Sequence, residues 1–347
     1  MDVKQKINLI TINNYFGQSL PTHISLQTES LKGKLQAHGY LVDFVDIQEI
    51  QKSSIKEKEY YIIGSHQNPT IKKYIDDVLA VCFQGEHEKQ LIPSRLNILA
   101  HENKGVQALI SKRIDARYFP SQYYYYTLTP LEKKMVVKKP DGAGSSGVEL
   151  ASSTHELSKI IERFSILDYS IKDILFNIKN IAKKYIFTKK YSNEFTSYHK
   201  KYSNYCLQEF YDNLSCDYKV LAFGKTLYVL KRDVRDGSFK ASGSGKFSYP
   251  EKNDRLLSFC HELRVALNTP YVSLDIVSLP SGEFKCIEFQ CAHFGPYTML
   301  NSQLKYVRSN TGDWVSFPND LTLEDAYAEA IHEYIKSLIP LNSGIAQ

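Results

Sequence analysis

The sequence lacks the features that mark several large classes of protein. It contains no run of eighteen or more apolar residues, and its first residues show no charged region followed by an apolar segment and a cleavage site. We therefore expect a cytoplasmic protein without a membrane span. The six cysteines include no CxxC pair, so the sequence indicates neither a zinc site nor a disulfide framework.

The chain also lacks a strong excess of charge. Lysine and arginine number 43 and aspartate and glutamate 38, which gives a net charge of +5. An excess this small is weak evidence for an anionic partner, and we expect no nucleic acid among the partners. The hydrophobic fraction of 43% and the charged fraction of 23% are typical of a folded globular protein.

The first hundred residues alternate β-rich runs with helical stretches, and this rhythm predicts an open parallel sheet of the α/β class. At 347 residues the chain exceeds the usual size of a single core, so we expect two or three subdomains. The predicted strands are INLITIN (7–13), LVDFVDI (41–47), YYIIGS (60–65) and VLAVCF (78–83).

The segments from residue 135 onward have a different predicted secondary structure. Residues 135–150 predict a β-hairpin around a glycine- and serine-rich turn, and the chain from 205 onward is dominated by strands. We therefore divide the chain into an N-terminal α/β domain (1–100), a central subdomain (101–205) and a C-terminal subdomain (206–347).

The hairpin turn DGAGSSGV (141–148) exposes backbone N–H groups that can close over phosphate oxygens. It lacks the GK[ST] ending of a Walker loop and is not expected to open a helix. Lys138 and Lys139 end the strand that enters the turn, where their charge can neutralise phosphates. The alternative is an ordinary tight hairpin whose lysines are solvated.

Two carboxylates lie on predicted antiparallel strands joined by the turn at 280–282. Asp275 belongs to YVSLDIV, while Glu288 and Gln290 belong to CIEFQ and share one face of their strand because they are two residues apart. Two carboxylates and an amide oxygen can share divalent cations that bridge ATP phosphates. Surface positions are the alternative interpretation.

Arg232 ends the strand TLYVLKR, and the serine- and glycine-rich segment FKASGSGK (239–246) follows it. A guanidinium group suits the planar oxygens of a transferring phosphoryl group. Read alone, the pattern favours the alternative of a solvated strand end followed by a mobile loop.

These motifs together resemble the ATP-grasp superfamily, and most of all its glutathione synthetase and ribosomal-protein glutamate ligase branch. The resemblance is strongest over LQEFYDNLSCDYKVLAFGKTLYVLKRDVRDGSFKASGSGK (207–246). In addition, VVKKPDGAGSSGV is similar to the phosphate-covering hairpin of the family, and LDIV and IEFQ are similar to its magnesium strands. The resemblance runs from about Lys104 to Met299 and implies the ATP-grasp fold behind an N-terminal parallel sheet domain.

The resemblance implies two catalytic residues, Arg232 at the acyl phosphate and Lys139 at the ATP phosphates. It places magnesium at Asp275, Glu288 and Gln290, and the family normally has asparagine in place of Gln290. The remaining ATP contacts that it implies are Lys104, Lys138, Gly144, Ser145, Ser146, Gln208, Glu209, Phe210, Tyr211, Asp217 and Lys219.

The implied function is an ATP- and Mg²⁺-dependent carboxylate–amine ligase that acts through an acyl phosphate. An ATP-grasp phosphotransferase and a non-catalytic ATP-binding regulatory protein are the alternatives, the latter because of Gln290. The expected partners are small-molecule or saccharide carboxylates and amines, with an amino acid, a peptide, or a uronic acid or polysaccharide as the candidates. The tyrosine run at 123–126 would suit stacking on a sugar ring. A homo-oligomer is also expected.

Residues 165–204 form a lysine-rich insertion with isoleucine and leucine at helical spacing, and it carries positive charge at 172, 179, 183, 184, 189 and 190. Four interpretations remain open. The insertion is a helix packed on its own domain, a lid or acceptor-binding element, a contact with a second subunit, or a peripheral contact with an anionic membrane.

Overall fold

The computed structural model describes residues 5–16, 25–52, 54–142, 147–167, 170–186, 192–198, 203–234, 245–292 and 294–338. The chain forms two compact units: unit 1 contains residues 1–120 and 213–347, and unit 2 contains residues 121–212. The three-part division stays a prediction. Predicted site residues 144–146 and the lysines at 189 and 190 lie outside the described residues.

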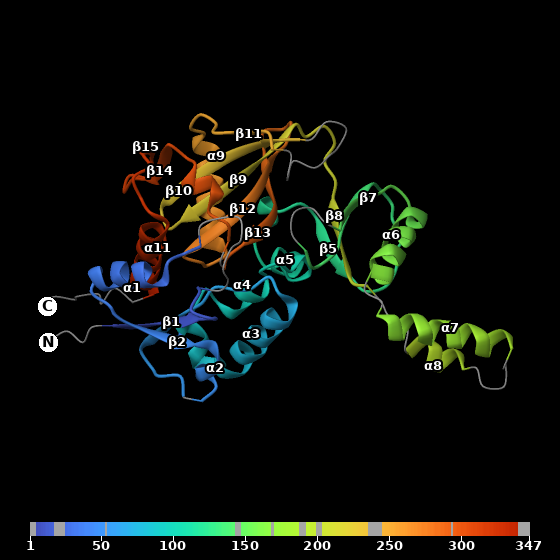
Figure 1. Cartoon of the computed structure of the whole chain (residues 1–347). Helices are drawn as coiled ribbons and strands as arrows, with labels where there is room; N and C mark the ends of the chain where they lie inside the picture. Colours follow the sequence, from blue (N-terminus) through green and yellow to red (C-terminus); the bar gives the residue numbers. More distant parts are fainter. Residues whose placement is uncertain are drawn as a thin grey trace, which may run out of the picture. The chain divides into compact units, whose positions relative to one another are not determined.

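Unit 1 begins with a parallel sheet in the order β2-β1-β3-β4 (Figure 1). The predicted parallel sheet is confirmed, since β1 pairs in parallel with β2 and β3. Its strands are β1 (Lys6–Thr11), β2 (Leu41–Asp46), β3 (Glu59–Ile62) and β4 (Leu91–Ile92). The helices of this part are α1 (Thr28–Ala37), α2 (Ile47–Ile50), α3 (Pro69–Cys82), η1 (Gly85–Gln90), α4 (Arg95–Leu99), α5 (Lys104–Ile110) and η2 (Ala116–Tyr118).

The prediction of a strand at 78–83 is wrong, because α3 continues through Cys82. Asn68 caps the start of this helix, and Pro69 occupies its first turn, where its missing N–H has no cost. Ile75, Val78 and Leu79 are buried together at helical spacing. A short apolar run in the buried stripe of a helix has the same sequence pattern as a buried strand. The strand that follows β3 in the sheet is β4 and not residues 78–83.

The second sheet of unit 1 is antiparallel, with the order β13-β12-β9-β10-β14-β15 and β11 paired with β10. Its strands are β9 (Cys216–Phe223), β10 (Thr226–Asp233), β11 (Phe247–Ser248), β12 (Tyr271–Ser278), β13 (Phe284–Gln290), β14 (Leu304–Arg308) and β15 (Trp314–Pro318). Three helices accompany it: α9 (Asp254–Ala266), α10 (Tyr297–Leu300) and α11 (Leu323–Leu338).

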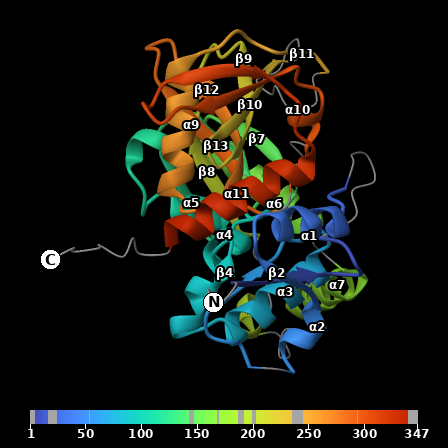
Figure 2. The ribbon, with the colours of Figure 1, turned by 90° about the vertical axis from the view of Figure 1, so that its left-hand side faces the viewer.

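Alternate residues of this sheet face two different cores, on which α9 and α11 pack (Figure 2). Val220 and Ala222 belong to the core that includes α9, whereas Leu221 and Phe223 belong to the core that includes α11. The second core also contains Ile7 and Leu9 of the parallel sheet and α1, which lies beside α11. The parallel and antiparallel sheets of unit 1 therefore share one core.

The described residues of unit 2 form an antiparallel sheet in the order β5-β8-β6-β7 and three helices. The predicted hairpin is confirmed, because β6 and β7 pair in antiparallel register. The elements are β5 (Gln122–Tyr125), β6 (Met135–Lys138), β7 (Val148–Ala151), α6 (Thr154–Leu167), α7 (Ile171–Tyr185), α8 (Asn193–Tyr198) and β8 (Tyr205–Glu209). The mixed α/β class predicted from the sequence is confirmed. None of the helices in the described ranges is long and apolar enough to span a bilayer.

Substitution of Phe223 tests how much the core shared by the two sheets contributes to stability. Its side chain is 2% exposed and its ring contacts those of Tyr228, Phe294 and Tyr327. We expect Phe223→Ala to lower the free energy of unfolding by about 3–5 kcal/mol, because the cavity cannot be filled by neighbouring rings. Urea denaturation measures the change. Phe317→Ala on β15, where the side chain is 44% exposed, is the matched control, and equal losses in both variants would contradict this account.

Candidate active site

A row of charged side chains crosses one face of the antiparallel sheet of unit 1. Arg232 of β10 lies opposite Asp217 of β9, Lys219 lies opposite Asp275 of β12, and Asp275 lies opposite Glu288 of β13. Residues directly opposite each other in neighbouring strands point to the same face. The sheet therefore brings together five of the residues that the resemblance assigns to ATP, the acyl phosphate or magnesium.

Arg232 is the centre of a buried ion-pair network. Its Nε and Nη2 donate to the two carboxylate oxygens of Asp217 at 2.6 and 2.9 Å. Its Nη2 also lies 3.1 Å from Oδ2 of Asp275, whose Oδ1 is 2.8 Å from Nζ of Lys219. The Arg232 side chain is only 10% exposed. The interpretation of a solvated strand end is therefore wrong, and the guanidinium neutralises carboxylates from two strands.

The two carboxylates of this network differ in acidity. Burial raises the pKa of Asp217 to about 6, in opposition to its ion pair with Arg232. Burial acts in the same direction on Asp275, but the charges of Arg232 and Lys219 outweigh it and hold the pKa of Asp275 well below its usual range. Asp275 is therefore a carboxylate at neutral pH.

Lys104 and Glu288 extend the row. Lys104 is the first residue of α5, and Asn103 caps that helix by accepting a hydrogen bond from the N–H of Val106. The Lys104 side chain is 6% exposed, and its Nζ lies 3.8 Å from Oε1 of Glu288. The lysine predicted at the ATP phosphates thus belongs to the same group of charges as the predicted metal residues.

Gln290 is oriented by a residue that the sequence analysis did not single out. Its Nε2 donates to Oε1 of Glu102 at 3.1 Å, and Nε2 of Gln67 donates to the same oxygen at 3.2 Å. Oε1 of Glu102 accepts both hydrogen bonds, so the NH₂ group of Gln290 faces Glu102. The amide oxygen of Gln290 is consequently turned away from Glu102.

Glu102 occupies an energetically unfavourable position. It is 7% exposed, and its Oε2 has no hydrogen-bond partner among the described residues. Burial and the charge of Glu288 both raise the pKa of Glu102. Its backbone is left-handed, with φ of 48°, which is uncommon for a residue other than glycine, asparagine or aspartate. A strained backbone beside a buried carboxyl group is typical of functional sites, but no sequence signal near Lys104 indicates it.

The donor chemistry of these residues fits magnesium. Asp275, Glu288 and Gln290 offer two carboxylates and an amide oxygen, which are ligands that hard cations prefer. The described part of the chain contains no group of three or more His, Cys, Asp or Glu side chains placed to hold a metal ion. Such a group is not required here, because the third predicted donor is the amide of Gln290.

The predicted ATP contacts of unit 2 lie on β6, β8 and the residues that follow them. Lys138 is 7% exposed at the end of β6, and the backbone N–H of Lys139 donates to the carbonyl oxygen of Gly147 at 2.7 Å. Gly147 has φ of 69°, and a Cβ there would lie 2.8 Å from Cβ of Lys139, so only glycine fits. The hairpin thus closes tightly beside Lys139.

The predicted ATP contacts at the end of β8 and just after it have partners within unit 2. The side chain of Gln208 is buried and donates to Oε1 of Gln122 at 3.0 Å. Glu209 accepts a hydrogen bond from Lys133 at 2.7 Å, and the Nζ of Lys134 lies 4.2 Å from the centre of the Phe210 ring. Tyr211 donates to Glu209 at 3.4 Å.

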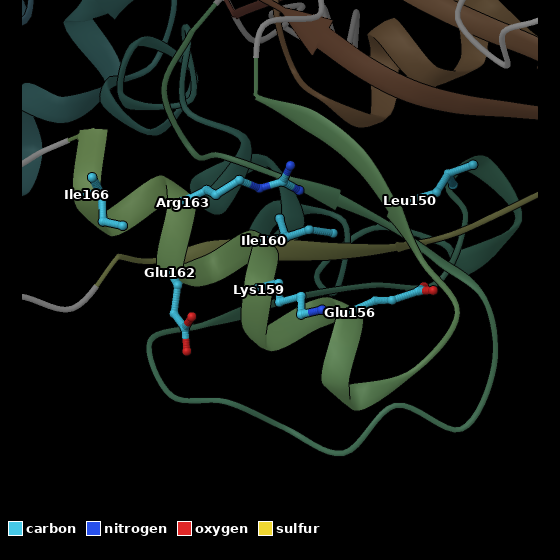
Figure 3. Close-up of a pocket in the computed structure, with 7 residues that line it drawn as sticks. All are labelled: Leu150, Glu156, Lys159, Ile160, Glu162, Arg163 and Ile166. Atoms are coloured by element: carbon cyan, nitrogen blue, oxygen red, sulfur yellow. The ribbon is translucent and has the colours of Figure 1, made fainter.

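Surface hollows of the two units do not coincide with these residues. Figure 3 shows one of about 420 Å³ between β7 and the outer side of α6 in unit 2. A second, of about 360 Å³, lies in unit 1 beside the turn at Gly282. The first is lined by Leu150, Glu156, Lys159, Ile160, Glu162, Arg163 and Ile166. Neither is lined by a predicted site residue, so neither is a candidate for the ATP site.

Comparison with solved structures identifies the fold. The structure of D-cycloserine synthetase superposes with a TM-score of 0.52 at 12% identity, over 94% of this chain and 99% of that chain. The D-alanine–D-alanine ligase of Bacillus anthracis gives 0.45 at 12% identity, over 96% of each chain. An ATP-grasp ligase, PsnB, in complex with a minimal precursor gives 0.49 at 11% identity, over 95% of this chain and 99% of that chain.

The chain has the ATP-grasp fold, as the sequence motifs predicted. The comparisons do not single out the glutathione synthetase and ribosomal-protein glutamate ligase branch. No protein-family model and no curated protein matches the sequence.

The network around Arg232 has a testable consequence for stability. Arg232→Ala leaves the carboxylates of Asp217 and Asp275 buried beside each other with one cation fewer, and we expect the free energy of unfolding to fall by about 3–5 kcal/mol. Thermal and urea unfolding measure it. Lys73→Ala breaks the exposed ion pair with Asp77 and serves as the control, for which we expect stability close to the wild type. An Arg232→Ala protein as stable as the control would contradict the network.

Proposed function

We propose that the protein is an ATP-dependent carboxylate–amine ligase. One observation carries this proposal: on a chain with the ATP-grasp fold, a partly buried row of Arg232, Lys219, Asp275 and Glu288 offers cations for phosphate oxygens and carboxylates for a metal ion. Pairing between such side chains offsets only part of the cost of removing them from water.

In this proposal the substrate carboxylate attacks the γ-phosphorus of ATP, and the bond to the β,γ-bridging oxygen breaks to release ADP. The amine nitrogen then attacks the acyl carbon of the acyl phosphate, loses a proton and displaces inorganic phosphate. Arg232 and Lys139 neutralise the oxygens of the transferring group, and Lys104, Lys138 and Lys219 bind the other phosphates. Preorganised charges of this kind lower the barrier without reorganising during the reaction.

Magnesium would be held by Asp275, Glu288 and Gln290, with the oxygen of Gln290 directed by Glu102. When bound, the ion supplies neutralising charge to the phosphate oxygens. The remaining ATP contacts are proposed at the hairpin residues Gly144, Ser145 and Ser146, at Gln208, Glu209, Phe210 and Tyr211, and at Asp217.

The carboxylate and the amine are small-molecule, peptide or saccharide groups in this proposal. Tyr123 and Tyr126 are 43% and 67% exposed, which would allow stacking on a sugar ring. The homo-oligomer and the cytoplasmic location stay predictions.

Isotope transfer distinguishes the proposed ligase from its two alternatives. With a candidate acid labelled with ¹⁸O in its carboxylate, a ligase transfers one ¹⁸O atom to inorganic phosphate for each ADP, and only when an amine is present. A phosphotransferase that uses a hydroxyl group produces ADP without labelled inorganic phosphate. A non-catalytic ATP-binding protein produces no ADP but still shows a nucleotide-induced melting shift. Panels of amino acids, peptides and uronic acids are the substrates to be screened by mass spectrometry.

Charge removal at the site is the second test. We expect Glu288→Gln and Lys139→Ala each to lower amine-dependent ADP release at least a hundredfold. Each substitution removes a side-chain charge that is proposed to contact the metal ion or the transferring phosphoryl group. Both side chains are at least partly accessible, so the melting temperature should change little. Lys159→Ala, which removes an exposed lysine of α6 in unit 2, is the control for Lys139→Ala. Turnover at the wild-type rate in both site variants would refute the assignment.

A further inference from the structure

The insertion carries an apolar surface that the other described residues of unit 2 leave exposed. Six large apolar residues of α7 are between 48% and 77% exposed: Ile171, Ile174, Leu175, Ile178, Ile181 and Tyr185. Their spacing of three or four residues places them along one side of the helix. We call this surface the α7 arc. Contiguous exposed apolar surface of this extent marks an interaction site.

The arc is not needed to hold the insertion together. Helix α8 lies beside α7 (Figure 1), and the two contact each other through the rings of Phe176 and Phe195, whose centres are 6.1 Å apart. Phe176 lies outside the arc on the helix surface, on the side away from Ile171 and Ile178. The arc therefore points away from the contact with α8. The interpretation of a helix packed by its apolar face on its own domain does not describe α7.

Positive charge borders the arc. Lys172, Lys179 and Lys183 are separated by seven and four residues, so they form a row along one edge of the apolar surface. The described residues of α7 include one acidic side chain, Asp173, which takes part in the capping box with Ser170. An apolar face beside a row of lysines is the pattern of a helix that lies in a membrane interface, with lysines at the level of the lipid headgroups.

We propose that α7 binds the surface of an anionic lipid bilayer. Fifteen residues of helix are about 22 Å long, which suits a helix lying flat and is too short to cross the hydrocarbon core. In an antiparallel pairing with a second copy of this chain the two lysine rows would lie beside each other and repel, which disfavours that partner. Negative headgroups complement the row, and the acyl chains accept the isoleucines.

Vesicle flotation of the full-length protein tests this proposal. The probes are vesicles of two parts phosphatidylcholine to one part phosphatidylglycerol, and vesicles of phosphatidylcholine alone. We expect binding to the anionic vesicles that is much weaker with the neutral ones. Changing all three bordering lysines to glutamine should weaken binding roughly a hundredfold, because each lysine near an anionic surface contributes about fivefold.

The apolar contribution is tested by Leu175→Glu combined with Ile178→Glu, which should abolish flotation. The matched control is Val81→Glu with Val265→Glu, since these residues are 70% and 54% exposed on α3 and α9. For the lysines, the control changes Lys52, Lys73 and Lys89 to glutamine and alters the net charge equally. Both controls should float like the wild type. Helix content and the ATP-induced melting shift should be the same in every variant, which separates this proposal from the proposed function.

Three results would overturn the proposal. The wild type fails to float with anionic vesicles, the Leu175→Glu/Ile178→Glu variant floats unchanged, or both lysine variants lose binding equally. A reversible dimer in sedimentation that the Leu175→Glu/Ile178→Glu variant abolishes, without vesicle binding, would assign the arc to a second copy instead.

Discussion

The contact between Arg232 and two carboxylates organises the charged face of the antiparallel sheet. Asp217 comes from β9 and Asp275 from β12, and β9 lies between β10 and β12 in the sheet. One guanidinium therefore links three strands through their side chains in addition to their backbone ladders. Lys219 supplies the second cation that Asp275 needs. With this arrangement in place, Glu288 on the next strand is the carboxylate of the row that Arg232 does not neutralise.

A second, partly buried contact joins the N-terminal part of unit 1 to this face. Glu102 and Gln67 precede α5, whereas Gln290 ends β13, and the three side chains share hydrogen bonds. The apolar core also joins the two sheets, since residues of β1 and β9 belong to the same cluster. The N-terminal sheet is thus part of the body that carries the site, and it determines the orientation of one proposed metal ligand.

Local patterns in the sequence were enough to predict most of the strands. The turn at 280–282 and the alternation around Glu288 predicted two antiparallel strands, and β12 and β13 have that form. The error at 78–83 arose because Val78 and Leu79 extend the buried stripe of a helix, and six residues cannot distinguish that stripe from a strand. The location of Arg232 on its strand was predictable from sequence, but its burial was not.

Local sequence patterns also predict only part of the candidate active site. Lys104, Asp275 and Glu288 stand in motifs that resemble a family, so a sequence can indicate them. The partner of Gln290 lies 188 residues away in the chain, at a position whose neighbours carry no recognisable signal. Contacts of this kind depend on tertiary packing, and a single sequence without its relatives contains no periodicity or spacing that reveals them.

Because the α7 arc lies apart from the contact with α8, folding places few constraints on which residues can occupy the arc. Stability constrains a residue only to the extent that folding removes its side chain from water, and the isoleucines of the arc stay largely in water. Polar replacements there would leave folding almost unaffected and would improve solubility. Drift under selection for folding alone would therefore erode the arc, so an apolar arc at the same positions in related chains would reflect selection for something other than the fold.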